Sequence, residues 1–223
     1  VTDSLYHNPL SNVFLKAATE YGLIQNHDFN EINQEGVGFY QVNQKNQQRH
    51  SAATAYLKPV LSRKNLTVKT NSHVTRILFS EKQVIGLVYQ IAHQNKNENQ
   101  NQEYQIKINK ELILSAGTIN SPQLLMLSGI GDSEHLKSLD IPVLFDLPGV
   151  GYNLQDHLFV SIAYKCTKPI TLANLDKPYN IFKYLFLRKG DLTSNISEAG
   201  GFLKTSANWN NPNLQLHFVP GCL

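Results

Sequence analysis

The stretch that follows Glu111 constrains the fold of this chain more than any other part of the sequence. Three apolar residues, Leu112–Leu114, run into the small residues Ser115, Ala116 and Gly117. Ser121 and Pro122 follow, and they are the residue types of a helix N-cap and a first helical position. We therefore predict that Leu112–Leu114 is a buried parallel strand that feeds a helix. A strand that ends in small residues before a helix N-terminus brings backbone N–H groups close to an anionic ligand.

The residues from Gly117 to Gly131 also match a family signature position by position. They read Gly-Thr-x-x-Ser-Pro-x-Leu-Leu-x-x-Ser-Gly-Ile-Gly. This run resembles the second signature of the glucose-methanol-choline (GMC) oxidoreductases, which are FAD-dependent alcohol oxidases and dehydrogenases. The resemblance implies an FAD cofactor and a small-molecule alcohol substrate. A primary alcohol or a choline-like compound would be oxidised to the aldehyde while a hydride passes to the flavin.

Other stretches resemble further parts of the same family, in the same order along the chain. Glu35–Tyr40 and Arg49–Pro59 resemble the approach to the first helix of the FAD-binding domain. Leu147–His157 is similar to the loop that crosses between the family's two domains. Ser194–Phe202 and Leu214–Phe218 resemble strands of the substrate-binding domain in the choline dehydrogenase branch.

The fold class that this resemblance implies is mixed α/β. We expect part of an FAD-binding Rossmann-like domain together with part of a substrate-binding domain that has an antiparallel sheet. Residues 1–30 are expected to form a helical segment of the substrate-binding domain, and 31–157 the central part of the FAD-binding domain. Residues 158–223 are expected to begin the rest of the substrate-binding domain.

The resemblance also assigns site residues. Those expected to contact FAD are Val74, Ser115, Ala116, Gly117, Asn153, Asp156 and His157. His217 and Ser197 are expected in the substrate cavity. Taken as single residues, the polar ones after Gly151 could equally cap backbone N–H groups, and His217 could be an ordinary strand histidine. Arg49, which precedes a helix N-cap, is either a solvated arginine or one that faces a phosphate.

Two features of the family have no match in this sequence. No G-x-G-x-x-G turn, which brings backbone to the FAD pyrophosphate, occurs in the 223 residues. The resemblance places the catalytic histidine beyond Leu223, so we assign no catalytic residue. We therefore expect an incomplete portion of an enzyme that is inactive alone. Alternatives are a non-catalytic remnant of a split gene and an FAD-containing hydroxynitrile lyase. Ser197 and His217 stand where photodecarboxylases of the family have Cys and Arg, which disfavours that reaction.

Composition excludes several classes of protein. Hydrophobic residues make up 41% and charged residues 17%, which is typical of a globular chain. A net charge of +3 with scattered basic residues indicates no nucleic-acid surface. No apolar run approaches the roughly 20 residues of a transmembrane helix. Cys166 and Cys222 form no disulfide framework and the histidines lack ligand spacing, so we expect no metal. We expect a cytoplasmic protein, and the sequence leaves its oligomeric state open.

The remaining elements follow from hydrophobic periodicity and turn residues. Helices are expected over Leu10–Tyr21, from Ser51 to Pro59, over 122–128 up to Gly129, over Tyr179–Leu187, and from Asp132 or Ser133 with Leu136 and Leu139 inward. Strands are expected over Leu66–Val68, Val74–Phe79, Val84–Ile91, Tyr104–Ile108, Phe159–Tyr164 and Leu214–Val219. The polar tract His93–Gln102 is expected to be a solvated hairpin tip. The Asn46-Gln47 turn is expected to be loose or strained, since glutamine disfavours positive φ.

Overall fold

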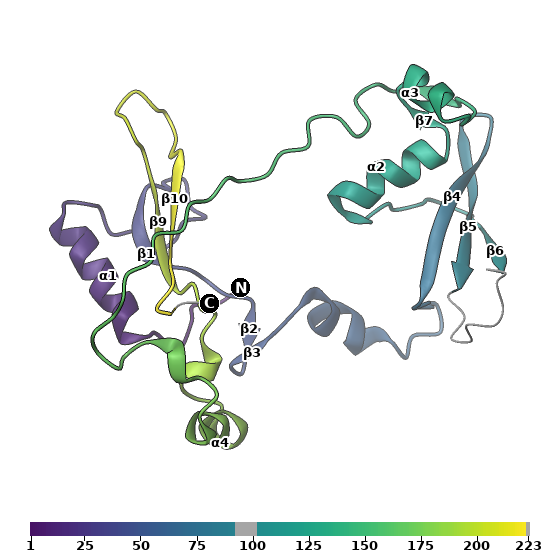
Figure 1. Ribbon diagram of the computed structural model, residues 1–223. Helices are drawn as coiled ribbons and strands as arrows, with labels where there is room; N and C mark the ends of the chain where they lie inside the picture. The colour runs from purple at the N-terminus through teal and green to yellow at the C-terminus, as the bar shows by residue number, and fades with distance from the viewer. Residues whose placement is uncertain (92–101, 222–223) are drawn as a thin grey trace. The chain divides into compact units, whose positions relative to one another are not determined.

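The computed structural model describes residues 1–91 and 102–221, and these form two compact units. Unit 1 combines Val1–Leu66 with Ser161–Leu223, and unit 2 is the continuous stretch Thr67–Val160 (Figure 1). Residues 31–66, which we expected in the FAD-binding segment, belong to unit 1. The assignment of the units to cofactor and substrate stays a prediction.

Helix α1 (Pro9–Glu20) opens unit 1 and confirms the helix expected over Leu10–Tyr21. Asn8 is its N-cap, because the Asn8 side chain accepts a hydrogen bond of 2.9 Å from the Leu10 N–H. Pro9 occupies the first helical position, where its missing N–H costs nothing. Gly22 follows the helix at a φ of +104°, a conformation that glycine adopts without strain. The residues at both ends thus fix the length of the helix.

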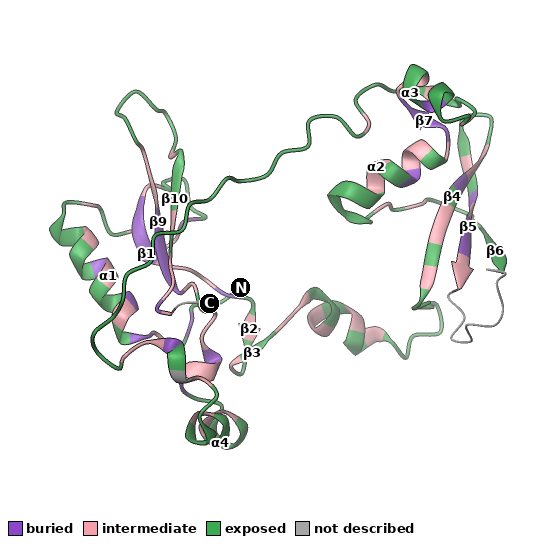
Figure 2. Ribbon diagram, viewed as in Figure 1, coloured by how far each residue is buried: buried purple, intermediate pink, exposed green. Residues whose placement is uncertain are grey.

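Three antiparallel strands form the sheet of unit 1, in the order β1 (Gly36–Phe39), β9 (Ala199–Leu203) and β10 (Leu214–Phe218). Because side chains alternate along a strand, one face of this sheet packs against α1. Leu15, Val37 and Ala199 are buried there and form the core of the unit, where β1 and β9 are coloured as buried in Figure 2. Phe14 of α1 stacks on Phe218 with 4.7 Å between ring centroids. The opposite face of the sheet carries His217.

A tight hairpin follows β1. Strands β2 (Gln44–Lys45) and β3 (Gln48–Arg49) pair antiparallel across the two turn residues Asn46 and Gln47. These have φ values of 54° and 58°. The turn is therefore strained rather than loose, since glutamine occupies a left-handed position that favours glycine or asparagine.

The other elements of unit 1 are helical. They are η1 (Ala53–Leu57), η2 (Lys58–Val60), η3 (Leu172–Asn174), α4 (Pro178–Leu187) and η4 (Asp191–Thr193). The N-cap residue of η1 is Ala52 and not Ser51 as predicted, although the Ser51 Oγ still accepts a hydrogen bond of 3.3 Å from the Thr54 N–H in the first turn. Pro59 lies inside η2 rather than at the end of the helix. α4 confirms the helix expected over Tyr179–Leu187.

Unit 2 is built on an antiparallel meander of β4 (Ser72–Ser80), β5 (Gln83–Ile91) and β6 (Glu103–Lys107). This confirms three of the predicted strands. The central strand β5 contributes the buried side chains Val88 and Tyr89. The hairpin tip that we expected over His93–Gln102 lies outside the described residues except for Gln102.

Helix α2 (Gly117–Leu127) packs along β4, as Figure 1 shows. Ser128 joins the two elements, because its Oγ accepts a hydrogen bond of 2.8 Å from the Ile77 N–H and donates one of 2.6 Å to the Leu124 carbonyl. The helix begins at Gly117, so our prediction of a start at Pro122 is wrong. Pro122 lies inside the helix, where it removes one backbone hydrogen bond. Gly129 follows the helix at a φ of +87°, as predicted for its end.

A short parallel pair completes unit 2. Strand β7 (Ile130–Gly131) pairs with β8 (Phe145–Asp146), and α3 (Ser133–Ser138) connects them. Asp132 caps α3 by accepting a hydrogen bond of 2.8 Å from the His135 N–H. Leu136 is fully buried as predicted, whereas Leu139 is 56% exposed. The prediction for Leu139 is wrong because that residue lies beyond the last residue of α3, where the chain turns.

Three predicted strands are absent from the structure. Leu66–Val68, Leu112–Leu114 and Phe159–Tyr164 have no strand conformation, and Ile113 is 78% exposed. An apolar run becomes a strand only where a neighbouring strand completes its backbone hydrogen bonds. In the described part of unit 2, β5 pairs with β4 and with β6, and β7 pairs with β8, but none of these strands pairs with Leu112–Leu114. The mixed fold class with antiparallel sheets is confirmed.

Candidate functional site

The predicted phosphate-binding residues lie where the chain enters α2. Ser115, Ala116 and Gly117 are all exposed. Ala116 is the N-cap residue and supplies no capping side chain, so the first helical turn keeps backbone N–H groups without side-chain partners. Gly117 has a φ of +88°, and no heavy atom lies within 4 Å of the place that a Cβ would take. Free donors at the positive end of a helix, beside open space, fit the pyrophosphate of FAD.

The loop expected at the flavin end of the cofactor rests on the same helix. The Leu147 N–H donates a hydrogen bond of 2.9 Å to the Gly131 carbonyl, and a Cβ at Gly151 would lie 3.5 Å from Met126 of α2. Beyond Gly151 the loop is exposed. A contact of that length is ordinary, so glycine is favoured at position 151 by its φ of +82° rather than by lack of space beside α2.

Within the part of the chain that the structure describes, the three polar residues of this loop make local side-chain contacts only. Asn153 has a φ of +59° and accepts a hydrogen bond of 2.8 Å from the Gln155 side chain. Asp156 accepts one of 2.8 Å from the His157 N–H. Neither contact caps a helix, so all three residues keep exposed polar groups that could reach a ligand. Their role toward FAD stays a prediction.

Val74 lies on β4 opposite Tyr89 and is half-buried. The register of the β4–β5 pair shifts directly after it, between Val74 and Arg76. Such a bulge re-aims side chains and backbone groups locally. Val74 shares unit 2 with Ser115–Gly117 and the 153–157 loop, and its contact with the adenine stays a prediction.

The two predicted substrate residues meet in unit 1. His217 on β10 and Ser197, just before β9, lie side by side, with 3.2 Å between Ser197 Oγ and His217 Nδ1. His217 is exposed on the sheet face opposite α1. The structure therefore brings these two residues together, while the cofactor candidates lie in the other unit.

Tyr40 completes this group, and sequence reasoning missed it. Its ring stacks on His217 with 5.5 Å between centroids, and its hydroxyl donates a hydrogen bond of 2.7 Å to the Leu216 carbonyl. Gln215, two residues before His217 on the same face, donates one of 3.3 Å to the Tyr40 hydroxyl. Burial raises the pKa of Tyr40, so the phenol keeps its proton and remains a donor. No local spacing indicates this contact, because Tyr40 and Leu216 lie 176 positions apart in the sequence.

A small hollow lies beside this group. It has a volume of about 210 Å³ and is lined by Val1, Phe29, Asn30, Gln34, Phe39, Tyr40, Gln41, Phe202 and Gln215. Phe29, Tyr40 and Phe202 contact one another at centroid distances of 5.1 to 6.4 Å. The hollow is thus walled by aromatic rings with amide groups at its edge, which suits a small organic molecule.

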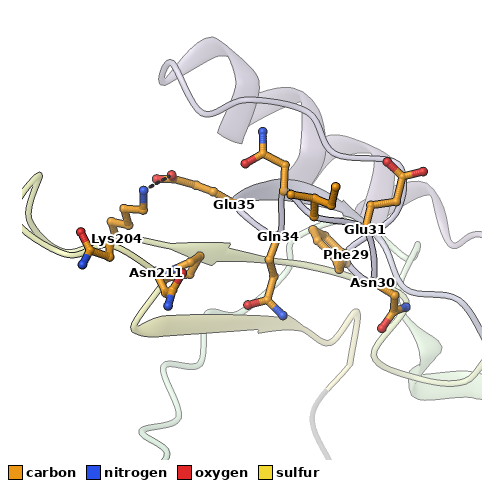
Figure 3. A pocket seen from close by; sticks show the side chains of 11 residues that line it. Phe29, Asn30, Glu31, Gln34, Glu35, Lys204 and Asn211 are labelled. Carbon is orange, nitrogen blue, oxygen red and sulfur yellow. Dashed lines mark ion pairs between the residues drawn. The ribbon is translucent and has the colours of Figure 1, made fainter.

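A larger hollow of about 470 Å³ adjoins the loop from Phe29 to Glu35 (Figure 3). Its side chains are mainly amides and carboxylates, and Lys204 is paired with Glu35 at 3.2 Å. None of the predicted site residues lines it. The smaller hollow is not lined by them either, but it is lined by Tyr40, which stacks on His217, and by Gln215, which donates to Tyr40, so we place the candidate substrate site there.

A buried carboxylate lies behind the Ser197 segment. Glu198 is fully buried and accepts three hydrogen bonds, from the Asn8 N–H at 2.6 Å, the Ser11 hydroxyl at 2.8 Å and the Ser194 hydroxyl at 2.5 Å. Asn8 is the N-cap of α1 and Ser11 lies in its first turn, where the helix dipole stabilises a negative charge. Glu198 therefore fastens the segment before β9 to α1.

The turn that carries Ser197 is strained. Ile196 has a φ of +71°, and the Ser197 N–H donates a hydrogen bond of 2.9 Å to the Asn195 carbonyl, which closes a three-residue turn. A β-branched residue in this region is an outlier that costs on the order of 1–3 kcal/mol. Ser194 holds the turn, because its Oγ accepts a hydrogen bond of 3.0 Å from the Ile196 N–H while it donates to Glu198.

His7 gives the region around Glu198 a pH dependence. Burial lowers the pKa of His7, and the nearby carboxylates of Glu198 and Asp3 only partly oppose this effect. Its ring stacks on Phe39 with 3.6 Å between centroids, and its Nε2 is buried without a hydrogen-bond partner. In the folded protein the neutral ring is therefore favoured over the cation.

We expect the free energy of unfolding to fall as the pH drops below about 6.5, because the unfolded chain then binds a proton that folded His7 resists. Above that pH His7 is neutral in both states and contributes no pH dependence. The measurement is urea unfolding at about pH 7.5 and about pH 5.5 for the wild type and His7→Phe. The phenylalanine variant keeps the stacking and should lose less stability on acidification. An equal loss in both proteins would contradict the assignment to His7.

Comparison with known proteins now gives the family. The chain matches the family described as GMC oxidoreductase over residues 1–159. This chain belongs to the GMC oxidoreductase family. The GMC chain is 44% identical over 225 residues to an alcohol dehydrogenase (acceptor) of Pseudomonas putida. The aligned region covers 99% of this chain and 40% of that protein. It is 40% identical over 218 residues to the mitochondrial choline dehydrogenase of Mus musculus, over 96% of the chain and 35% of that protein.

Solved structures agree with this membership. An FAD-dependent oxidoreductase from Chaetomium thermophilum superimposes with a TM-score of 0.71 at 30% identity, over 88% of this chain and 35% of that chain. A formate oxidase variant of Aspergillus oryzae has a TM-score of 0.78 at 21% identity, over 99% and 41% of the two chains, and shows the fold alone.

These matches also show how much of the length of its relatives this chain covers. It spans only 35% to 41% of the lengths of these four proteins. The family and its FAD-dependent structural neighbour indicate FAD as the cofactor. In the part of the chain that the structure describes, no helix is long and apolar enough to cross a membrane.

Proposed function

We propose that this chain contributes to an FAD-dependent oxidoreductase that acts on the CH–OH group of a primary alcohol, choline-like compounds included. The observation that carries the proposal is the exposed, uncapped N-terminus of α2 with open space beside Gly117. It lies within the stretch that carries the family signature. Its backbone donors suit a pyrophosphate, and FAD when bound supplies the acceptor for the hydride.

The residues of unit 2 would bind and orient the cofactor. The first-turn N–H groups after Ser115, Ala116 and Gly117 would hold the phosphates, and Val74 would meet the adenine. Asn153, Asp156 and His157 are exposed polar residues of the loop that rests on α2, and they would lie toward the flavin. None of these roles requires a charged side chain to be buried.

The residues of unit 1 would bind the alcohol. His217 and Ser197 offer polar groups on the open face of the sheet, and the rings of Tyr40 and Phe202 form an apolar wall beside them. A hydroxyl group could bind at the imidazole while its carbon chain lies along the rings. The size of the adjacent hollow favours a small alcohol over a polymer.

A chimaeric enzyme tests the proposal. The matching segment of the Pseudomonas putida alcohol dehydrogenase, which is 44% identical over 225 residues, is replaced by this chain. We expect the chimaera to purify with flavin bound, and the flavin absorbance to bleach when a primary alcohol or choline is added without oxygen. A monodisperse, flavin-loaded chimaera that stays oxidised with every alcohol would favour the hydroxynitrile lyase alternative. A monodisperse chimaera without flavin would contradict the cofactor assignment.

The chain by itself is expected to bind FAD weakly. It contains the α2 site but no G-x-G-x-x-G turn, so it supplies only some of the contacts that the family makes to the cofactor. Titration of FAD fluorescence with the purified chain should show a dissociation constant above about 10 μM, which corresponds to less than about 7 kcal/mol of binding energy. A stoichiometric flavin spectrum after gel filtration would overturn this expectation.

A further inference from the structure

We infer that Ser197 positions His217: its hydroxyl donates to His217 Nδ1 and keeps the proton of the neutral ring on Nε2, which is the atom offered to the substrate. This inference deepens the proposed function and rests on the placement of His217 in the alcohol site. It assigns Ser197 to the imidazole rather than to direct contact with the alcohol.

The imidazole of His217 is held from two sides. Tyr40 stacks on one face of the ring, and Ser197 Oγ lies 3.2 Å from Nδ1. Tyr40 is itself fixed by its hydrogen bonds to the Leu216 carbonyl and from Gln215. Among the described residues, nothing forms a hydrogen bond with Nε2 of His217. The ring is therefore oriented by its protein contacts and still has one nitrogen available.

The position of Ser197 is set by the strained turn. The Ser194 and Glu198 side chains hold the turn at Ile196, and Glu198 is anchored on the first turn of α1. The Asn195 side chain adds a hydrogen bond of 3.1 Å to the Ser197 carbonyl. Strain that persists in a folded protein is maintained by surrounding contacts, and it commonly marks a residue whose exact direction matters. Here the residue so directed is Ser197.

The direction of the Ser197 hydroxyl decides the tautomer of His217. Among the described residues Ser197 Oγ has no acceptor other than His217 Nδ1, which favours donation by the hydroxyl and would make Nδ1 the acceptor nitrogen. Nε2 then carries the proton and can donate to the oxygen of an alcohol. A substrate oxygen bound in this way is oriented but not deprotonated by His217, so His217 binds and does not act as the base.

Nitrogen NMR of the imidazole tests the inference in the chain itself, without flavin or alcohol. In the wild type above about pH 8, the long-range ¹⁵N–¹H spectrum should show His217 with a protonated Nε2 and an unprotonated Nδ1. Ser197→Ala should move both nitrogen shifts toward the average of the two tautomers, and Ser197→Thr, which keeps the hydroxyl, should restore them. Ser80→Ala, a change at an exposed serine of unit 2, is the matched control and should leave them unchanged. A protonated Nδ1 in the wild type, or unchanged shifts in Ser197→Ala, would overturn the inference.

Kinetics of the chimaera test the consequence for the substrate. Ser197→Ala should raise KM for the alcohol about five-fold with little change in kcat. The variant loses the hydrogen bond to His217 Nδ1, so the proton is no longer held on Nε2, which binds the alcohol oxygen. An unchanged KM would sink the inference while leaving the proposed function intact. If the chimaera reacts with no alcohol, the proposed function fails, and the NMR result still decides whether Ser197 sets the tautomer.

Discussion

Replacing Glu198 with alanine is expected to lower the free energy of unfolding by about 3–5 kcal/mol, the largest effect that we anticipate for a single substitution. The change removes the acceptor for the Asn8 N–H and for the hydroxyls of Ser11 and Ser194, and two of these donors are on buried residues. Buried donors without partners cost about 1–3 kcal/mol each. Urea unfolding followed by the fluorescence of Trp209, the single tryptophan of the chain and part of unit 1, measures the loss.

Glu20→Gln is the matched control for this experiment. Glu20 ends the same helix α1, but its side chain is exposed and, among the described residues, forms only a surface ion pair of 3.8 Å with Lys16. Such pairs contribute about 0.3–0.5 kcal/mol, so the control should unfold almost as the wild type does. If Glu198→Ala lost no more than the control, the carboxylate would not be fastening β9 to α1.

Gly200→Ala is expected to cost about 2–3 kcal/mol, the upper part of the range for overpacking. A Cβ at this position of β9 would meet the Leu216 carbonyl oxygen of the neighbouring strand and would lie 2.6 Å from Cε2 of Tyr40. A backbone oxygen in a paired strand moves only if the sheet distorts, so the clash is not relieved cheaply. Tyr40 would also lose its stacking position on His217, and the His217 ring signals should shift in the NMR spectrum.

Gly221→Ala serves as the control in the same unit. A Cβ there would make an ordinary contact of 3.5 Å with Leu172, and the backbone at Gly221 needs no left-handed conformation. We expect a change within about 0.5 kcal/mol. Equal stability of Gly200→Ala and Gly221→Ala would show that the sheet face beside Tyr40 is more open than the structure indicates.

The fold could be predicted from sequence wherever the signal is local. Asn8 and Pro9 mark the start of α1, Gly22 marks its end, and Asp132 marks the start of α3. The alternating strands of unit 2 were likewise predicted from their own residues. Leu112–Leu114 was predicted wrongly because three apolar residues form a buried strand only where a neighbouring strand pairs with them. Those three residues do not say whether such a strand is present.

Only part of the candidate site could be predicted, again because local sequence signals were available and distant contacts were not. The small residues before α2 carry their own signal, since glycine at a φ of +88° can be anticipated from the sequence. Ser197 and His217 followed from the resemblance. Tyr40 and Glu198 did not, because their contacts join residues more than a hundred positions apart, and no spacing in the sequence indicates such a contact. The glycine pair Gly38 and Gly200 was a signal of close approach that went unused.

The division of unit 1 into two distant segments imposes an order on its formation. Asn8 and Glu198 are separated by 190 positions, and β1 reaches its sheet partner only in β9. During synthesis, α1 and β1 therefore leave the ribosome before β9 does. Their apolar faces stay exposed until β9 has been made. The strand pairs in the described part of unit 2, by contrast, form within one continuous stretch of the chain. Because local contacts form sooner than distant ones, we expect unit 2 to fold before β9 can pair with β1, and we expect chaperone dependence to concentrate on the first segment of unit 1.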